Sequence, residues 1–280
     1  MHKLFRLSRK EQLLVQFILI AWACVVLLPI GVAVINSFKP NLGEVYRAPL
    51  ALPSSWSWDN YVKAWYGASF GKFFMNSAII SISTVLIVTF AASTTAFVLV
   101  RMPFKGSVFI FAMLMVGVVI PLRLALAPLF TVVRSLGLLD TLSGVILVQS
   151  ASMMPVAVFI LAAFLKSVPS ELEDAAKIDG ALPFSIYWRV VLPIIKPAMA
   201  TVALLSFVSA WNEYFLPLIF LQSPDNYPIT LGITQFKSQF AVQWHLMFAG
   251  ILIMLIPTMI AFLLASRQFI EGLTSGGVKE

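Results

Sequence analysis

The sequence predicts an all-α integral membrane protein with six transmembrane helices. Of its 280 residues, 60% are apolar and 11% are charged, whereas soluble proteins carry roughly 25% charged residues. A helix needs about 20 apolar residues to cross a bilayer. Six runs contain no Asp, Glu, Lys or Arg, and each predicts one span: residues 12–38, 73–100, 106–122, 141–165, 197–212 and 238–266.

The first run follows a basic segment and resembles a signal peptide at first sight. Its apolar part extends from Leu13 to Ile35, which is too long for a signal-peptide core of about 7 to 15 residues. We therefore expect an uncleaved span. It contains Cys24, the single cysteine of the chain, so neither an intrachain disulfide nor a cysteine-based metal or redox site is possible.

The third and fifth runs are too short to span and must extend past a charged residue, Arg123 and Glu213 respectively. Arg123 follows Pro121 by two residues. It lies either in the turn of a broken helix or snorkels outward to the interface.

Basic residues fall mainly in alternate loops, which predicts the orientation. With six spans, both termini lie on the same side of the membrane. The segments on that side hold twelve Lys and Arg residues: 1–12, 101–106, 166–196 and 267–280. The loops of the other side hold only Lys39, Arg47, Lys63, Lys72 and Lys237. The basic side of a membrane protein faces the cytoplasm, so both termini are predicted to be cytoplasmic in a multi-pass protein of the cell membrane. This topology explains the net charge of +7 without a nucleic-acid partner.

The loop 166–196 gathers eight charged residues between two apolar runs. Ser170 and Glu173 have the spacing of a capping box, which predicts a helix from Glu171. Gly180 favours a left-handed bend after that helix, and Pro183 suits the first turn of a second one.

Each predicted helix of this loop has a face defined by helical spacing. The first face contains Leu172, Ala175, Ala176 and Asp179, and the second contains Phe184, Tyr187, Trp188 and Val191. Small residues beside bulky aromatics suit docking into the groove of a partner. The alternative is an interfacial connector with a buried apolar stripe.

The same loop resembles the EAA loop of ABC importer permeases. The residues that carry the resemblance are Asp174, Ala175, Ala176, Gly180, Val190, Leu192 and Pro193, which fall at the spacing of that motif. Asp174 stands where the motif has Glu and Val190 where it has Ile. The resemblance implies that an ATPase contacts Leu172, Asp174, Ala175, Ala176, Asp179, Gly180 and Phe184.

Motifs elsewhere resemble the maltose-type sugar-importer permeases with the type I importer fold. They are WDNY at 58–61, NS at 76–77, LGLLDT at 136–141, WNEYFLPL at 211–218 and the tail at 272–280. The resemblance implies a permease subunit for a sugar, oligosaccharide or related polyol. The implied partners are a second, homologous permease, two ATPase subunits that bind ATP and Mg, and an extracytoplasmic solute-binding protein.

Catalytic motifs are scarce. The chain has no G-x-x-x-x-G-K-[ST] phosphate loop, so we expect it to bind no cofactor itself. Its only histidines, His2 and His245, belong to no H-E-x-x-H motif. We therefore predict no catalytic residue and no metal site.

Polar residues inside the spans are candidates for the lining of a pathway: Gln149, Asn212 and Glu213. A charge at the centre of a lipid-facing helix costs roughly 2.5 to 3.5 kcal/mol or more, so Glu213 should face the bundle interior or a wet cavity. Alternatively the helix bends near Pro217 and Glu213 marks its outer end. Gln149 either lines a passage or holds helices together.

We expect three regions: an N-terminal segment with the first span and an outer loop (1–70), a permease domain of five spans (71–266) and a cytoplasmic tail (267–280). Two other classes of protein remain open. A secondary transporter would need inverted repeats or buried carboxylate relays, and only Glu213 offers such a carboxylate. A membrane scaffold subunit would also explain a docking loop.

Overall fold

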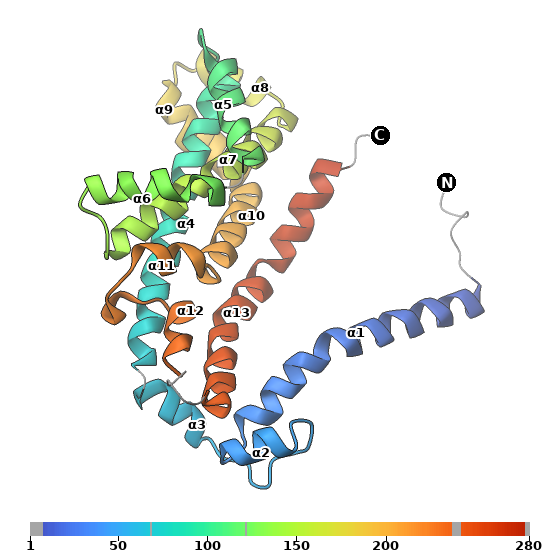
Figure 1. The fold of residues 1–280 in the computed structure, drawn as a ribbon. Coiled ribbons are helices and arrows are strands. Elements are labelled where there is room, and N and C mark those ends of the chain that lie inside the picture. Colours follow the sequence, from blue (N-terminus) through green and yellow to red (C-terminus); the bar gives the residue numbers. More distant parts are fainter. Residues whose placement is uncertain (1–7, 68, 121, 237–241, 278–280) are drawn as a thin grey trace. The chain divides into compact units, whose positions relative to one another are not determined.

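The computed structural model describes residues 8–67, 69–120, 122–236 and 242–277 of the chain (Figure 1). It is built from helices, some of them extended by short 3-10 or π-helical turns. In chain order the α-helices are α1 (Arg9–Ser37), α2 (Leu42–Arg47), α3 (Asp59–Val62), α4 (Phe70–Arg101), α5 (Ser107–Val119), α6 (Leu126–Ser135), α7 (Leu142–Ser167), α8 (Glu171–Ile178), α9 (Pro183–Ile186), α10 (Leu192–Trp211), α11 (Phe215–Phe220), α12 (Ile229–Gly232) and α13 (Trp244–Gly277).

The chain forms two compact units. The first contains residues 1–70 and 233–253, and the second contains residues 71–232 and 254–280. The division of the sequence into an N-terminal segment, a permease domain and a tail stays a prediction.

A buried polar cluster fixes the end of α1 within the first unit. The Lys39 ammonium donates to the Asn36 side-chain oxygen at 2.8 Å and to the Ala48 carbonyl at 2.6 Å. The Asn60 amide donates to the carbonyls of Ser37 and Lys39, both at 2.8 Å. These bonds satisfy side chains that burial would otherwise penalise, and they give the segment after α1 a defined structure.

Five helices of the described chain are long and apolar enough to cross a membrane, and a bent pair adds a sixth candidate. The pair is α5 with the segment 122–135, and its two parts meet at an angle of 94°. The third predicted span is therefore broken just before Arg123, which lies in a 3-10 turn, Leu122–Ala125. Of the two positions predicted for Arg123, the structure shows the broken-helix turn.

The predicted extension of the fifth span past Glu213 is wrong. The continuous helical segment runs from Pro183 to Trp211, so the extra length lies at its N-terminal end. The reason is local: a π-helical turn, Tyr187–Val191, joins α9 to α10 without a break, and α10 ends at Trp211. Glu213 then falls beyond the end of α10.

The core of the second unit lies where α4, α7 and α10 meet. Small side chains are frequent there and let the helices approach closely, as is common in membrane bundles. The buried members of this core are Val88, Ala92, Ala96, Phe97, Ala157, Val158, Leu161, Ala162, Leu165, Ile186, Tyr187, Val191, Ile195, Ala198 and Val202. Three of them come from the loop between α7 and α10, so the base of this loop belongs to the same core.

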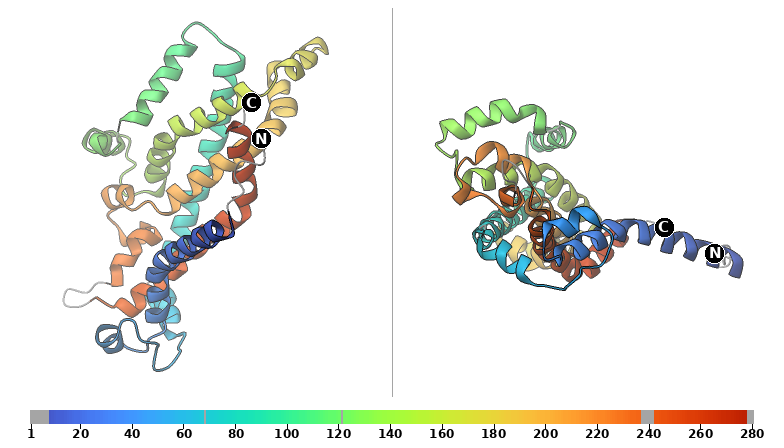
Figure 2. Two further views of the ribbon diagram at one scale, coloured as in Figure 1. Left: turned by 90° about the vertical axis from the view of Figure 1, so that its right-hand side faces the viewer. Right: turned by 60° about the horizontal axis from the view of Figure 1, so that its bottom comes forward.

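The loop 166–196 and the loop 221–229 lie at opposite ends of α4. Figures 1 and 2 show α8 and α9 near the end of α4 that leads into α5, while α11 and α12 lie toward the start of α4. The helix has 32 residues, which corresponds to about 48 Å. One helix thus reaches from the loop 166–196 to the loop 221–229.

Candidate functional site

The loop 166–196 contains α8 and, after Gly180, α9, and both helices begin where the sequence predicts. Only α8 is a separate short helix, since α9 continues into α10. Helix α8 starts at Glu171, and Gly180 follows it with a φ of +79°. The Ala181 N–H donates to the Ala176 carbonyl at 2.9 Å and the Gly180 N–H to the Lys177 carbonyl at 3.0 Å. These bonds close the C-terminus of α8, as expected for a left-handed glycine just past a helix. Pro183 opens α9 at its first turn.

The predicted capping box at the start of α8 is wrong. The Ser170 side chain makes no capping hydrogen bond, and the Glu173 side chain does not turn back toward Ser170. Instead the Glu173 carboxylate lies 2.8 Å from the Arg101 guanidinium. Because α4 supplies a cation at this place, the carboxylate pairs with that charge rather than with a neutral backbone N–H.

The second predicted face of the loop is divided in the structure. Phe184 is 75% exposed and Trp188 is 40% exposed, whereas Tyr187 and Val191 are buried in the core. The prediction assumed α-helical spacing, but residues 187–191 form a π-helical turn, which has a wider repeat and rotates side chains away from their expected positions.

The exposed side of the loop is apolar. Its large exposed side chains are Leu172, Ile178, Leu182 and Phe184. Contiguous exposed apolar side chains next to charged ones indicate an interaction surface in a soluble environment. The docking interpretation is favoured over a connector with a buried stripe, because these four large side chains of the described loop remain exposed. Ile186 of α9 is buried in the core instead.

Most of the residues assigned to ATPase contact lie on this exposed side. Leu172, Asp174, Ala175, Asp179, Gly180 and Phe184 are exposed, and Ala176 is half-buried against the core. Asp174 pairs with Lys177 at 2.7 Å on the surface of α8. Apart from the two neighbours of Gly180 in the chain, no described residue has an atom within 4 Å of the position that a Cβ of residue 180 would occupy. Its surroundings are therefore open in the isolated chain.

The three candidate pathway residues lie around the end of α10. The buried Gln149 amide on α7 donates to the Ala210 carbonyl at 3.3 Å. The exposed Asn212 side chain donates to the Val208 carbonyl one turn earlier, at 2.8 Å. The Glu213 carboxylate accepts the N–H groups of Phe215 at 2.7 Å and Leu216 at 3.2 Å. Glu213 therefore caps α11, and its role as pathway lining stays a prediction.

Arg123 joins the bend between α5 and α6 to the same region. Its guanidinium lies 4.5 Å from the centre of the Phe215 ring, a cation–π contact. Phe215 is the first residue of α11, beside the Glu213 cap. The broken third span is thus in direct contact with the start of α11.

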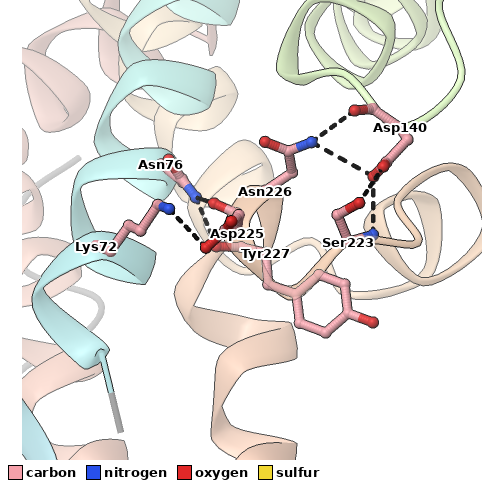
Figure 3. A network of polar contacts seen from close by, with 7 residues as sticks. All are labelled: Lys72, Asn76, Asp140, Ser223, Asp225, Asn226 and Tyr227. Atoms are coloured by element: carbon pink, nitrogen blue, oxygen red, sulfur yellow. Dashed lines mark hydrogen bonds and ion pairs between the residues drawn. The ribbon is translucent and has the colours of Figure 1, made fainter.

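A polar network joins three segments at the far end of α4 (Figure 3). Lys72 on α4 pairs with Asp225 at 2.6 Å, and the Asn76 amide donates to the Asp225 and Tyr227 carbonyls. Asp140, in the turn between α6 and α7, accepts hydrogen bonds from the Ser223 hydroxyl and from the N–H groups of Ser223 and Gln222. These donors, first of all the Ser223 side chain, lower the pKa of Asp140 to about 2.

The sequence did not single out Arg101, Glu173 or Asp140 for these roles. Arg101 is the residue that ends an apolar run, where a basic residue is ordinarily expected at the membrane interface, so its pairing with Glu173 could not be predicted from the sequence. Asp140 has a φ of +57°, which a sequence does not reveal. Among the described residues, no group of three His, Cys, Asp or Glu side chains is placed to hold a metal ion.

Residues 67–268 match the model of a protein family described as binding-protein-dependent transport system inner membrane components. The chain is 32% identical over 261 residues to the diacetylchitobiose uptake system permease protein NgcG of Streptomyces coelicolor, with 92% of this chain and 86% of the relative covered. It is 33% identical over 257 residues to the arabinooligosaccharides transport system permease protein AraQ of Bacillus subtilis, with 90% of each chain covered.

The fold is similar to that of a solved transporter chain. A bacterial ABC transporter involved in the import of the acidic polysaccharide alginate contains a chain that superimposes with a TM-score of 0.82. The match covers 94% of this chain and 99% of that chain at 21% sequence identity. The predicted importer-permease fold is confirmed.

Proposed function

Because the chain belongs to the family of binding-protein-dependent transport system inner membrane components, we propose that it is a permease subunit of an ATP-driven importer for a sugar, oligosaccharide or related polyol. The observation that carries the proposal is the exposed apolar side of the loop 166–196, which coincides with the EAA-like motif. One relative is named for the transport of arabinooligosaccharides and another for the uptake of diacetylchitobiose, which supports a short oligosaccharide as the proposed substrate.

The proposed assembly contains this chain, a second homologous permease subunit, two ATPase subunits and an extracytoplasmic solute-binding protein. ATP and Mg are bound by the ATPases. Both termini and the loop 166–196 lie in the cytoplasm, where an ATPase reaches Leu172, Ile178, Leu182 and Phe184. Their uncovered surface supports this placement, since contact with an ATPase groove would remove apolar area from water.

In the proposed cycle, ATP-driven closure of the two ATPases moves the loop 166–196. Helix α10 continues from this loop without a break, so movement of the loop is passed directly to a membrane helix. The permease pair then changes between inward-facing and outward-facing states. Such coupling requires an element with two arrangements that both sites influence.

The test is uptake by the complete complex in proteoliposomes, with binding protein outside and ATP inside. We expect oligosaccharide uptake that requires both ATP and the binding protein. Uptake driven by an ion gradient without ATP would indicate a secondary transporter. Complete absence of uptake from a correctly assembled complex would indicate a scaffold subunit.

A further inference from the structure

Arg101 is the last residue of α4. Its side chain makes two polar contacts at the C-terminus of α7 and one with α8. Its guanidinium donates to the Leu165 carbonyl at 2.9 Å and to the Val168 carbonyl at 2.6 Å, at the C-terminus of α7. Its Nε lies 2.8 Å from Oε1 of Glu173 on α8. One side chain therefore connects α4 with both α7 and α8.

The ion pair between Arg101 and Glu173 is buried, so each charge depends on the other for compensation. The side chains of Arg101 and Glu173 are only 13% and 5% exposed. The geometry between Nε and Oε1 is that of a close ionic contact rather than a well-aligned hydrogen bond. Removal of one partner would leave the other charge buried without compensation, a strongly unfavourable state.

A second contact on the same face of α4 holds the other limb of the loop. Ser93, Phe97 and Arg101 are four residues apart along α4 and so lie in one line. The Tyr187 hydroxyl lies 2.7 Å from the Ser93 hydroxyl, and the rings of Tyr187 and Phe97 are 5.4 Å apart between their centres. One stripe of α4 thus contacts both α8 and the π-helical turn.

We propose that Arg101 is a positioning residue that joins the coupling loop 166–196, through Glu173, to α4 and α7. A push on α8 then moves α4 and α7 together with α10, rather than bending the loop on its own. This inference rests on the proposed function, since it assumes that an ATPase pushes on the loop. Arg101 and Glu173 act from beneath the exposed docking side, without contact with the ATPase.

The primary test is Glu173→Gln in the complete transporter in proteoliposomes. The matched control is Lys177→Gln, which removes an ion pair of the same helix, 2.7 Å long but more than half exposed. For Glu173→Gln we expect ATPase subunits to co-purify at the unaltered level, while the amount of sugar imported per ATP hydrolysed falls by about tenfold, within the usual range of coupling factors. Lys177→Gln should leave this ratio unchanged.

A double variant, Arg101→Met with Glu173→Met, separates coupling from folding. It leaves no unpaired buried charge, so the amount of complex in the membrane should recover even if Glu173→Gln accumulates poorly. We expect its ratio of sugar to ATP to remain low, because the connection between α4 and α8 is still missing.

Three results would overturn the inference: an unaltered ratio in Glu173→Gln, recovery of the ratio in the double variant, or loss of the ATPase subunits from both variants. The last result would mean that the pair shapes the docking surface instead of transmitting movement. ATP-dependent uptake by the unaltered complex tests the proposed function separately, so failure of the two ideas can be told apart.

Discussion

Asp140 accepts hydrogen bonds from both the hydroxyl and the backbone N–H of Ser223. This single carboxylate joins the turn between α6 and α7 to the loop 221–227. The same loop is tied to α4 through Lys72 and Asn76 (Figure 3). Three segments that are distant in the sequence therefore share one polar network at the end of α4 opposite the loop 166–196.

We expect Asp140→Ala to destabilise the second unit by about 1 to 2 kcal/mol through loss of these hydrogen bonds. The loss stays moderate because solvent weakens hydrogen bonds to a partly exposed carboxylate. Asp140→Asn should lose less, since Asn tolerates the left-handed backbone and keeps one acceptor oxygen. Thermal unfolding of the purified chain in detergent measures both. Equal stability of Asp140→Ala and the unaltered chain would contradict the importance of the network.

The same carboxylate predicts a pH dependence. Its pKa is lowered to about 2 in the folded chain from an ordinary value of 3.8. A lowered pKa means that the stabilisation is fully present above the ordinary value and is lost as the pH falls toward 2. Unfolding followed between about pH 5 and 2 should show a loss of stability in the unaltered chain that is smaller in Asp140→Asn.

Gly180→Val should leave the chain in the membrane but abolish ATP-driven uptake. The φ of +79° is unfavourable by about 1 to 2 kcal/mol for a residue with a Cβ. Beyond the two chain neighbours of residue 180, none of the residues that the structure describes comes within 4 Å of that Cβ, so we expect a steric clash only with a docked partner. The measurements are the rate of ATP-driven uptake and the amount of ATPase that co-purifies with the variant.

Gly137→Val is the matched control for this variant. Gly137 has a φ of +68° and equally open surroundings, so it carries a similar backbone strain outside the loop 166–196. We expect it to retain most of the uptake. Normal transport by Gly180→Val with the ATPase bound would show that the loop is a passive connector.

Glu213→Gln should preserve assembly of the complex, because the Gln side-chain oxygen can still accept the N–H groups of Phe215 and Leu216. Glu213→Ala should cost roughly 1 kcal/mol through loss of the α11 cap. If Glu213 also lines a wet pathway, Glu213→Gln alters uptake and a cysteine at this position reacts with small polar reagents. An unreactive cysteine together with normal uptake would leave capping as the sole role.

The orientation can be tested with cysteines introduced at Ser57, Gln222 and Ser275 in a variant that lacks Cys24. The positive-inside rule predicts labelling from outside at the first two positions only. Membrane-impermeant thiol reagents on intact cells make the measurement, and permeabilised cells provide the control for reactivity. Labelling of position 275 from outside would contradict the proposed cytoplasmic side of the loop 166–196.

Features of this protein that depend on local chemistry could be predicted from the sequence. Charge-free apolar runs identify membrane helices because each helix satisfies its backbone hydrogen bonds within its own segment, so a span can be recognised from that segment alone. Gly180 and Pro183 determine the bend of the loop through their own backbones: glycine adopts a positive φ without a Cβ clash, and proline fixes its φ in the helical range. The spacing from Asp174 to Pro193 also gave the family resemblance, since it is read along one continuous segment.

Contacts between side chains that are far apart in the sequence follow from the packing of the helices and could not be predicted. The local pattern at Ser170 predicted a capping box, but Arg101 from α4 lies beside Glu173 and an ionic partner outcompetes a neutral one. The length of the fifth span was misjudged because the π-helical turn 187–191 continues α9 into α10, so the helix that Pro183 opens is the beginning of the span itself. The partners of Asp140 likewise depend on side chains that approach one another only after the helices pack.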